Sequence, residues 1–539
     1  MMTEARKAAT SALGRRTLLA ASAAAPALMT LGEARAQGVA PRRGGVLNTI
    51  ITPEPPVLIL GVNNQGPTLI VASKIYQGLL TVTPSLDPAP DLAKSWTRSD
   101  DGLTYTFALQ EGVKWHDGRD FTSEDVIFSI MKFHMEVNPR ARAILQRIDK
   151  AEAPDAHTVR FTLKAPFEPF LLIFDVTACA MVPKHIYDGT DFRNNPANAT
   201  PIGTGPFKFA EWQRGNFIRM VRNEQYWKPN QPYLDGITWR IVPDSQSRAL
   251  ALQTGQVQMT TSNDIEPFDV PRFQQQPNLT VALNGWEYFS PLSWIEINNR
   301  LDNLKDPRFR RAMAHAVDRN FIAQRLWFGV GKPATGPIAS TTRFHDPSVQ
   351  MPAFNPREAN AILDGMGLRP NAQGVRASIK LMQIPYGEVW NRLSEYLRQA
   401  MRQVGIEVTL ESTDVAGWVR RLAAWEFETT INFVYQWGDP TLGVERTYVT
   451  SNIQKVAFTN TAGYSNPEVD RLFEAARNAA QAEERRRLFS EAQKKIVEDM
   501  PLVWLMELAF PTIHDKRLNN VIRTGTGVHA SFDDVFLSA

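Results

Sequence analysis

The residues best suited to chemistry are aromatic side chains that stand beside carboxylate or amide groups. The two clusters are Trp286-Glu287-Tyr288-Phe289 with Trp294, and Phe433-Val434-Tyr435-Gln436-Trp437-Gly438-Asp439-Pro440. Neither follows the spacing of a helical stripe. Aromatic faces can bury a small ligand while one or two polar groups orient it. The clusters therefore predict a closed ligand pocket, and the alternative is aromatic packing between domains.

The sequence carries no motif that supports an enzyme, a cofactor or a metal site. The stretch Gly329-Val330-Gly331-Lys332-Pro333 lacks the spacing and the hydroxyl of a phosphate-binding loop, and no GxSxG nucleophile motif is present. No two of the eight histidines lie three or four residues apart, so none forms a helical metal pair. The single cysteine, Cys179, excludes an intramolecular disulfide and lies in an apolar run, where we predict a buried, inert thiol.

Residues 1–36 resemble a signal peptide in their order of segments. A basic stretch ends in Arg15-Arg16, an apolar run follows from Leu18 to Leu31, and Ala34-Arg35-Ala36 forms a small-x-small cleavage site. The run is too short to span a membrane comfortably. The arginine pair resembles a twin-arginine signal, and the alternative is a chance pair in an ordinary secretory signal. We therefore expect an exported protein that is soluble in the periplasm after cleavage.

Composition and charge limit the class of protein. The 539 residues are 43% hydrophobic, which is enough for a large core in more than one domain. The formal charge is only +3, and residues 1–36 account for it with five basic residues against two acids, which leaves 54 of each in the rest. A balanced chain does not indicate a nucleic-acid partner. Specificity must therefore come from a few buried groups and aromatic walls.

Short strand-like runs alternate with longer helical ones from Arg42 onward, which favours an α/β architecture. Expected strands are 46–51, 103–109, 157–163, 237–242, 379–383 and 502–506. Expected helices begin at Thr122, at Asp306-Pro307 and at Asn466-Pro467, and a further one covers 390–404 with Gly405 as its C-cap. The segment after Pro511 would suit interleaved domains if it returned to an earlier sheet.

Several longer motifs together resemble one family, the extracytoplasmic solute-binding proteins of the peptide/nickel type, called family 5, which deliver ligands to ABC importers. The densest block runs from Leu92-Ala93-Lys94-Ser95-Trp96 through Ser99 to Phe107, Gly112 to Gly118 and Phe121 to Val126. Further matches are Gly44 to Leu47, Gly203 to Phe207, Asn223 to Trp227, Leu234 to Ile237, Asp306 to Ala312, Ala316 to Arg319 and Trp437 to Pro440. The resemblance covers nearly the whole chain after residue 36.

This resemblance implies a type II, cluster C-like periplasmic binding protein with two α/β lobes, an extra domain and a ligand cleft between hinged lobes. The expected parts are a signal peptide at 1–36, lobe I from 37–84, 204–296 and 508–539, an extra domain II from 85–203, and lobe III from 297–507. A ligand that signals closure must contact both lobes, because equal affinity for open and closed forms would shift nothing. We expect a monomer that serves a membrane permease.

The resemblance also implies ligand-binding residues. In peptide-binding members an aspartate of the matching loop pairs with the ligand's α-amino group, and Asp439 stands at that position. Trp418 matches a pocket tryptophan. The remaining candidates come from the aromatic clusters: Trp437, Tyr435, Trp286, Tyr288 and Trp294. The competing interpretation makes Asp439 an N-cap before Pro440 and Thr441. No basic residue is identified for a peptide carboxylate.

The predicted function is a periplasmic, non-enzymatic receptor for a small solute, a dipeptide, an oligopeptide or a related amine-bearing compound. An opine, sugar or metal-chelate receptor of the same fold is an alternative. A secreted enzyme is the alternative from a different class, because twin-arginine export often serves cofactor enzymes. The missing cofactor and nucleophile motifs count against that enzyme.

Overall fold

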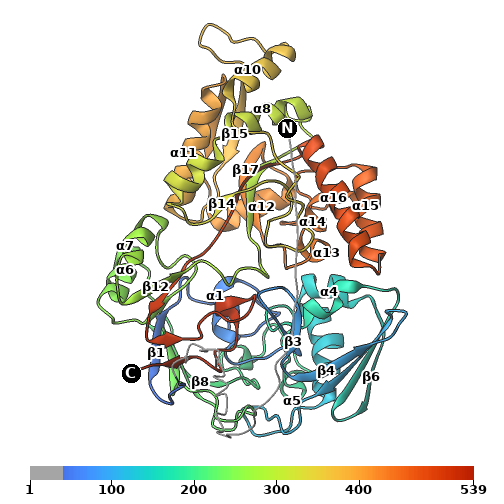
Figure 1. Ribbon diagram of the computed structural model, residues 1–539, viewed down its shortest axis with the longest axis vertical. Helices are drawn as coiled ribbons and strands as arrows, with labels where there is room; N and C mark the ends of the chain where they lie inside the picture. The colour runs from blue at the N-terminus through green and yellow to red at the C-terminus, as the bar shows by residue number, and fades with distance from the viewer. Residues whose placement is uncertain (1–39) are drawn as a thin grey trace, which may run out of the picture. The chain divides into compact units, whose positions relative to one another are not determined.

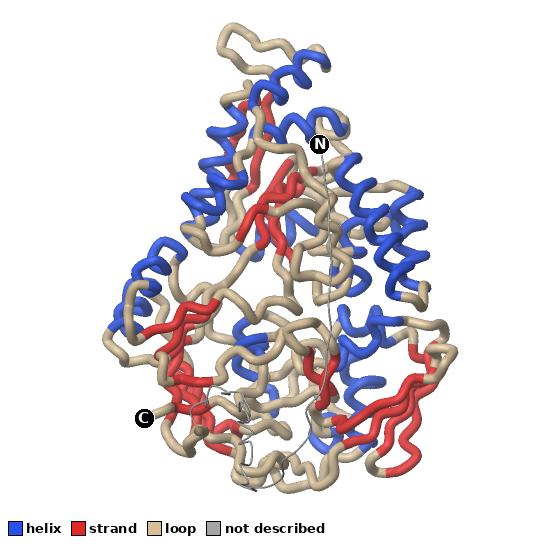
Figure 2. The backbone as a smooth tube through the Cα atoms, in the orientation of Figure 1, coloured by secondary structure: helices blue, strands red, loops and turns tan. Residues whose placement is uncertain are grey.

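The strands of this protein fall into three main sheets in a computed structural model that describes residues 40–539. The predicted signal peptide lies outside these described residues. Residues 41–539 form one unit by their contacts. Figure 1 shows the elements with their labels, and Figure 2 separates the strands from the helices beside them. We call the region around the seven-stranded sheet lobe I, that around the four-stranded sheet domain II, and that around the six-stranded sheet lobe III.

Lobe I contains strands from the beginning, middle and end of the chain. Its seven-stranded sheet has the order β12 (Leu279–Ala282), β19 (Thr512–Asp515), β11 (Met259–Thr260), β1 (Val46–Ile50), β10 (Gly236–Arg240), β9 (Phe217–Arg222) and β8 (Phe207–Gln213). β1 pairs in parallel with β10 and β11, whereas β19 is antiparallel to β11 and β12. The C-terminal segment therefore returns to an earlier sheet, as the sequence allowed.

Lobe III is built on a mixed sheet. Its strands have the order β14 (Lys332–Pro333), β18 (Val503–Glu507), β13 (Leu292–Ile297), β17 (Thr429–Val434), β15 (Ala377–Met382) and β16 (Ile406–Glu411). Its main helices are α8 (Pro307–Ala316), α10 (Pro356–Gly365), α11 (Glu388–Arg402), α12 (Val415–Ala424), α15 (Pro467–Asn478) and α16 (Ala482–Asp499). All residues of β13 and β18 are buried, including the polar residues Ser293, Glu296 and Glu507.

Domain II has an antiparallel sheet, ordered β4 (Ala93–Arg98), β5 (Thr104–Leu109), β7 (Thr158–Leu163) and β6 (Ile148–Asp155). Its helices are α2 (Ser123–Phe128), which continues as a π-helix over Ser129–His134, α4 (Pro139–Leu145) and the 3₁₀-helix η2 (Glu168–Phe174). β5 alternates partly and fully buried residues. The expected boundary at residues 84 and 85 falls in the turn of a hairpin between β2 (Leu80–Val82) and β3 (Pro88–Pro90).

Helix starts agree with the polar residues that the sequence places before them. Thr122 and Asp125 form a capping box at α2, and Asp306 accepts a hydrogen bond from the Arg308 N–H at the start of α8. The predicted end of the helix at 404 is two residues too late. Gln403 is the C-cap of α11, and Gly405 follows it in the left-handed region at φ 80°.

Two segments join the lobes, because the chain passes from the lobe I sheet to the lobe III sheet and later returns. Residues 283–291 connect β12 of lobe I to β13 of lobe III, and residues 508–511 connect β18 back to β19. This pair of crossover segments confirms the two-lobed architecture expected from the family resemblance. Near them, Gly285 and Gly527 approach so closely that a Cβ on Gly527 would lie 2.4 Å from the Gly285 carbonyl oxygen.

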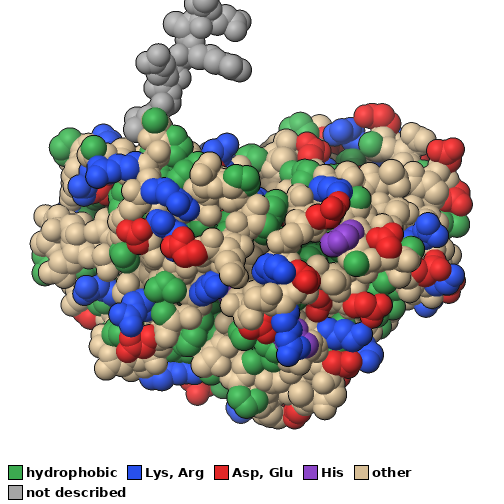
Figure 3. Space-filling view, turned by 90° about the horizontal axis from the view of Figure 1, so that it is seen from below, with side chains coloured by type: hydrophobic (Ala, Val, Ile, Leu, Met, Phe, Trp, Pro, Cys, Tyr) green, Lys and Arg blue, Asp and Glu red, His purple; other side chains and the backbone are tan. Residues whose placement is uncertain are grey.

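Acidic and basic side chains are interspersed on the face shown in Figure 3, without a large patch of one sign. This agrees with the balanced charge of residues 37–539. Among residues 40–539, no helix has the length and apolar character needed to cross a membrane.

Candidate functional site

A cavity of about 150 Å³ lies where the crossover segments meet both lobes. Its lobe I wall comes from the end of β1, the start of α1 (Gly66–Ala72) and the turn 261–264 after β11. Its opposite wall comes from Phe433 and Tyr435 at the end of β17, with Trp286 and Phe510 from the two crossover segments. A solute held there would contact both lobes, which is the arrangement that ligand-driven closure needs.

Four of the seven predicted site residues meet at this place. Their rings form a chain through Phe289: Trp286 lies 5.5 Å and Tyr435 5.3 Å from its centroid, and Tyr435 lies 5.6 Å from Trp437. Tyr288 packs 5.7 Å from Trp437, and its hydroxyl donates to the Leu172 carbonyl of domain II. The aromatic clusters of the sequence therefore do come together, partly as cavity wall and partly as packing between domains.

Trp418 and Trp294 occupy other surroundings. Trp418 is fully buried, donates to the Thr430 hydroxyl and packs 5.8 Å from Tyr386. Trp294 lies within β13 and donates from Nε1 to Glu296 at 2.5 Å. Neither residue lines the cavity. Trp294 thus packs inside lobe III, away from the aromatic chain around Phe289.

The loop before Asp439 is held in an unusual backbone conformation. Trp437 has φ 56° and Gly438 φ 71°, and such a value is rare for a bulky side chain. Gln436 is buried and fixes the loop, because its Oε1 accepts from the Ala339 N–H and from the Thr342 hydroxyl, both at 2.8 Å. Gln436 therefore holds this loop against the segment 339–342.

Asp439 has the N-cap role that the sequence offered as the competing interpretation. Its Oδ1 accepts from the Thr441 N–H at 2.9 Å and caps α13 (Pro440–Gly443). The same oxygen pairs at 2.9 Å with Arg485, and both side chains have no exposed surface. Asp439 does not line the cavity, and among the described residues its Oδ2 has no hydrogen-bond partner. Its role as the amine-binding group stays a prediction.

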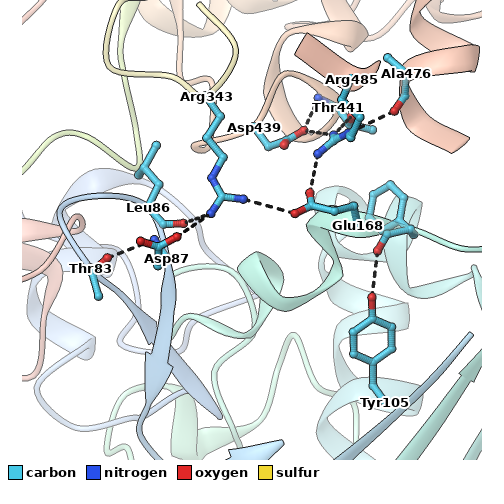
Figure 4. A network of polar contacts seen from close by, with 11 residues as sticks. Thr83, Leu86, Asp87, Tyr105, Glu168, Arg343, Asp439, Thr441, Ala476 and Arg485 are labelled. Carbon is cyan, nitrogen blue, oxygen red and sulfur yellow. Dashed lines mark hydrogen bonds and ion pairs between the residues drawn. The ribbon is translucent and has the colours of Figure 1, made fainter. Parts of the chain in front are cut away.

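Arg485 also joins lobe III to domain II (Figure 4). It forms a short ion pair with Glu168 of η2, and Arg343 approaches the other Glu168 oxygen at 3.6 Å. Arg343 further contacts Asp87 and the Leu86 carbonyl in the β2–β3 turn. Burial and the nearby Asp439 raise the pKa of Glu168, against the two arginines. We call Arg343, Arg485, Glu168 and Asp439 the interlobe ion-pair network.

Two further cations lie behind the aromatic chain, and sequence reasoning missed both. The Arg140 guanidinium stacks 3.3 Å above the Trp437 ring, and Arg446 Nη2 donates to the Tyr435 carbonyl at 3.5 Å. Burial lowers the pKa of both, that of Arg446 to about 10 with Arg140 also contributing. Neither pairs with a carboxylate of the described residues. Their positions depend on long-range packing, so no local signal could have identified them.

The single cysteine has the buried position that the sequence predicts. Cys179 is buried, and burial raises the pKa of its thiol to about 12, which agrees with an unreactive residue. Over residues 40–539, no three His, Cys, Asp or Glu side chains are grouped so that they could hold a metal ion.

Comparison with known proteins identifies the class. The sequence matches the family described as bacterial extracellular solute-binding proteins, family 5 Middle, over residues 87–455, so the chain belongs to this family. Its members bind small-molecule solutes and work with ABC transporters. The protein is accordingly a solute-binding receptor and not an enzyme.

Individual relatives agree along nearly the whole chain. The glutathione-binding protein GsiB of Salmonella typhi is 30% identical over 483 residues, which is 87% of this chain and 90% of that protein. The periplasmic binding protein DppA of Helicobacter pylori, solved with the peptide STSA, has TM-score 0.79 at 24% identity and covers 92% and 99% of the two chains. The agropinic acid-binding AgaA of Agrobacterium tumefaciens R10 has TM-score 0.77 at 23% identity, covering 92% and 99%. These two structures show the fold alone.

Proposed function

We propose that this protein is a periplasmic receptor that captures a peptide-type solute, a dipeptide, short oligopeptide or related amine-bearing compound, and delivers it to an ABC importer. The supporting observation is the cavity between the lobes, with aromatic walls from both crossover segments and from β17 and polar groups from lobe I. Binding there favours the closed form because the solute touches both sides. The glutathione- and peptide-binding relatives support a peptide-type solute.

Arg140 and Arg446 support a peptide-type solute because they could bind its carboxylate. A peptide carries a carboxylate, and a buried guanidinium without an acidic partner gains a charge-assisted hydrogen bond from one. Both arginines contact the backbone or ring of residues in the 435–437 segment, next to the cavity wall. They are the proposed partners of the solute's carboxylate.

Native mass spectrometry of the protein purified from the periplasm tests the receptor function. We expect a non-covalent small molecule that is released on denaturation, is identified by fragmentation and contains an amide or amine. Fragmentation also separates peptides from opines, sugars and metal chelates. Chemical conversion of that molecule by the pure protein would contradict a receptor.

We propose that residues 1–36 direct export through their twin-arginine signal and are then removed, so that the receptor acts as a soluble monomer. The intact mass of the secreted protein should correspond to a chain beginning at Gln37. Replacing Arg15 and Arg16 by lysines should retain the precursor in the cytoplasm if the pair is a true twin-arginine signal. Normal export of that variant would favour the ordinary secretory route.

A further inference from the structure

One acidic residue, Asp264, lines the interlobe cavity, and no relative's name assigns it a function. Of the residues that line the cavity, Asp264 is the one carboxylic acid, and none is a lysine, an arginine or a histidine. The residue is 1% exposed, and no cation among the lining residues balances its carboxylate. An ionised carboxylate in so dry a place is costly unless a positive group joins it.

The turn that presents Asp264 is built around its carboxylate. The Thr261 N–H donates to Oδ2 at 2.9 Å, and the Asp264 N–H donates to the Thr261 carbonyl at 3.1 Å. Ser262 takes φ 53° between them, an uncommon conformation for a residue other than glycine. Thr261 also lines the cavity, and its buried hydroxyl has no partner among the described residues. The turn therefore offers a carboxylate and a free hydroxyl side by side.

The nearest cation does not neutralise this carboxylate. Arg248 donates from Nε to the Asp264 backbone carbonyl at 2.6 Å and from Nη1 to the Val242 and Pro243 carbonyls. It fixes the turn by its backbone and forms no ion pair with the Asp264 side chain in the described part of the chain. Asp439 differs, because its Oδ1 already forms an ion pair with Arg485 at 2.9 Å.

The opposite wall suits a cation as well. Trp286, Tyr435, Phe433 and Phe510 present aromatic rings to the same cavity. A desolvated ammonium is attracted to an aromatic face in addition to its contact with a carboxylate. The cavity of about 150 Å³ has room for an ammonium group and the atoms next to it.

We propose that Asp264, with the Thr261 hydroxyl and the aromatic wall around Trp286, forms the subsite that receives the ammonium group of the solute. This proposal rests on the proposed receptor function and specifies the group of the solute that the receptor recognises. The subsite is on lobe I and the Tyr435 wall is on lobe III, so the same ammonium group contributes to closure. Asp439 then serves the interlobe ion-pair network.

The test compares two probes on four proteins. The probes are an equimolar mixture of dipeptides and the same mixture after N-acetylation, which removes the ammonium group and keeps the rest. The proteins are wild type, Asp264→Asn, Asp439→Asn and Asp269→Asn. Asp269 is an acid on the same segment that pairs with Arg272 and does not line the cavity, so its variant is the matched control. Native mass spectrometry counts retained dipeptides, and thermal melting checks folding.

We expect wild type and Asp269→Asn to retain free-amine dipeptides at least tenfold better than acetylated ones. Asp264→Asn should lose at least tenfold of the free-amine binding and nearly all of the discrimination while staying folded. The inference is overturned if Asp264→Asn still discriminates like wild type, or if only Asp439→Asn loses the discrimination. Absence of any bound dipeptide in all four proteins would overturn the peptide-type receptor, and the inference with it.

Discussion

At the scale of single residues, two buried aspartates have different roles. From the sequence, Asp439 is a candidate for both ammonium binding and helix capping, whereas we propose Asp264 for the ammonium group. Asp439 is locked to Arg485 and to the first turn of α13, whereas Asp264 faces the cavity without a cation. Burial raises the pKa of Asp264 to about 7, although the Thr261 N–H and Arg248 oppose that shift. A buried carboxyl group with a strongly raised pKa is typical of a binding site whose ligand carries the opposite charge.

The ligand-free stability should depend on pH through Asp264. Between its unfolded pKa of 3.8 and its folded pKa of about 7, the folded state keeps a proton that the unfolded state has released. Its contribution to stability is therefore present below that window and is lost as pH rises through about 7. Asp264→Asn should then be more stable than wild type at pH 8, with a smaller difference at pH 5. Urea unfolding at both pH values measures this, and an equal difference at both would contradict it.

Asp439→Asn should destabilise the fold more than an ordinary N-cap change. It leaves the fully buried Arg485 with Glu168 as its acidic partner among residues 40–539, and breaking a buried pair costs about 3–5 kcal/mol. The control is Asp306→Asn, an N-cap whose pair with Arg308 is exposed and whose loss should cost less than about 1 kcal/mol. Denaturant unfolding measures the free energy of unfolding of both variants. Equal losses of stability would show that the Arg485 contact contributes little.

At the scale of elements, close backbone approaches shape the loop that carries Trp437 and Asp439. A Cβ on Gly443, at the end of α13, would lie 2.4 Å from the carbonyl carbon and oxygen of Gln436. Since both contacts are with backbone, no side-chain movement can relieve them.

Gly443→Ala should therefore shift the loop, lower the free energy of unfolding by about 1–3 kcal/mol and weaken solute binding. Gly365→Ala in α10 is the matched control, because no atom lies within 4 Å of its Cβ position. That change should raise stability by about 0.5–1 kcal/mol, as alanine is the better helix former. The same denaturation series tests both, and a neutral Gly443→Ala would contradict the tight packing.

The elements were predictable where local chemistry determines them. Thr122, Asp306 and Asn466 mark helix starts that the structure confirms, and the strands at 46–50 and 158–163 follow their apolar runs. The site was only partly predictable. Arg485 is 46 residues from Asp439 and Glu168 is 317 residues from Arg485, so nothing local links them. Asp264 lies in a polar stretch of the sequence, and its burial at the cavity between the lobes could not be predicted from that stretch.

At the scale of the whole molecule, the interlobe ion-pair network couples ligand capture to closure. Glu168 of domain II faces Arg485 and Arg343 of lobe III, so these contacts form only when the lobes are together (Figure 4). Their free energy favours the closed form before any solute arrives, and a larger closed population raises the apparent affinity.

Glu168→Gln should reduce that closed population. We expect a larger radius of gyration without solute and an affinity weaker by about tenfold, the factor that 1.4 kcal/mol of closing free energy provides. Glu211→Gln is the control, because Glu211 pairs with Arg219 on the surface of one hairpin. Small-angle X-ray scattering and calorimetry with the solute identified by mass spectrometry measure both effects. Equal behaviour of the two variants would remove the network from the closing mechanism.

The central claim is that a cationic solute is held between the lobes in the cavity bordered by Trp286, Tyr435 and Asp264. A crystal structure of the protein with its co-purified solute tests it most directly. The account predicts density for the solute in this cavity, with a positively charged nitrogen within hydrogen-bond distance of the Asp264 carboxylate. A solute bound elsewhere, or one in this cavity with no cationic group near Asp264, would contradict the account.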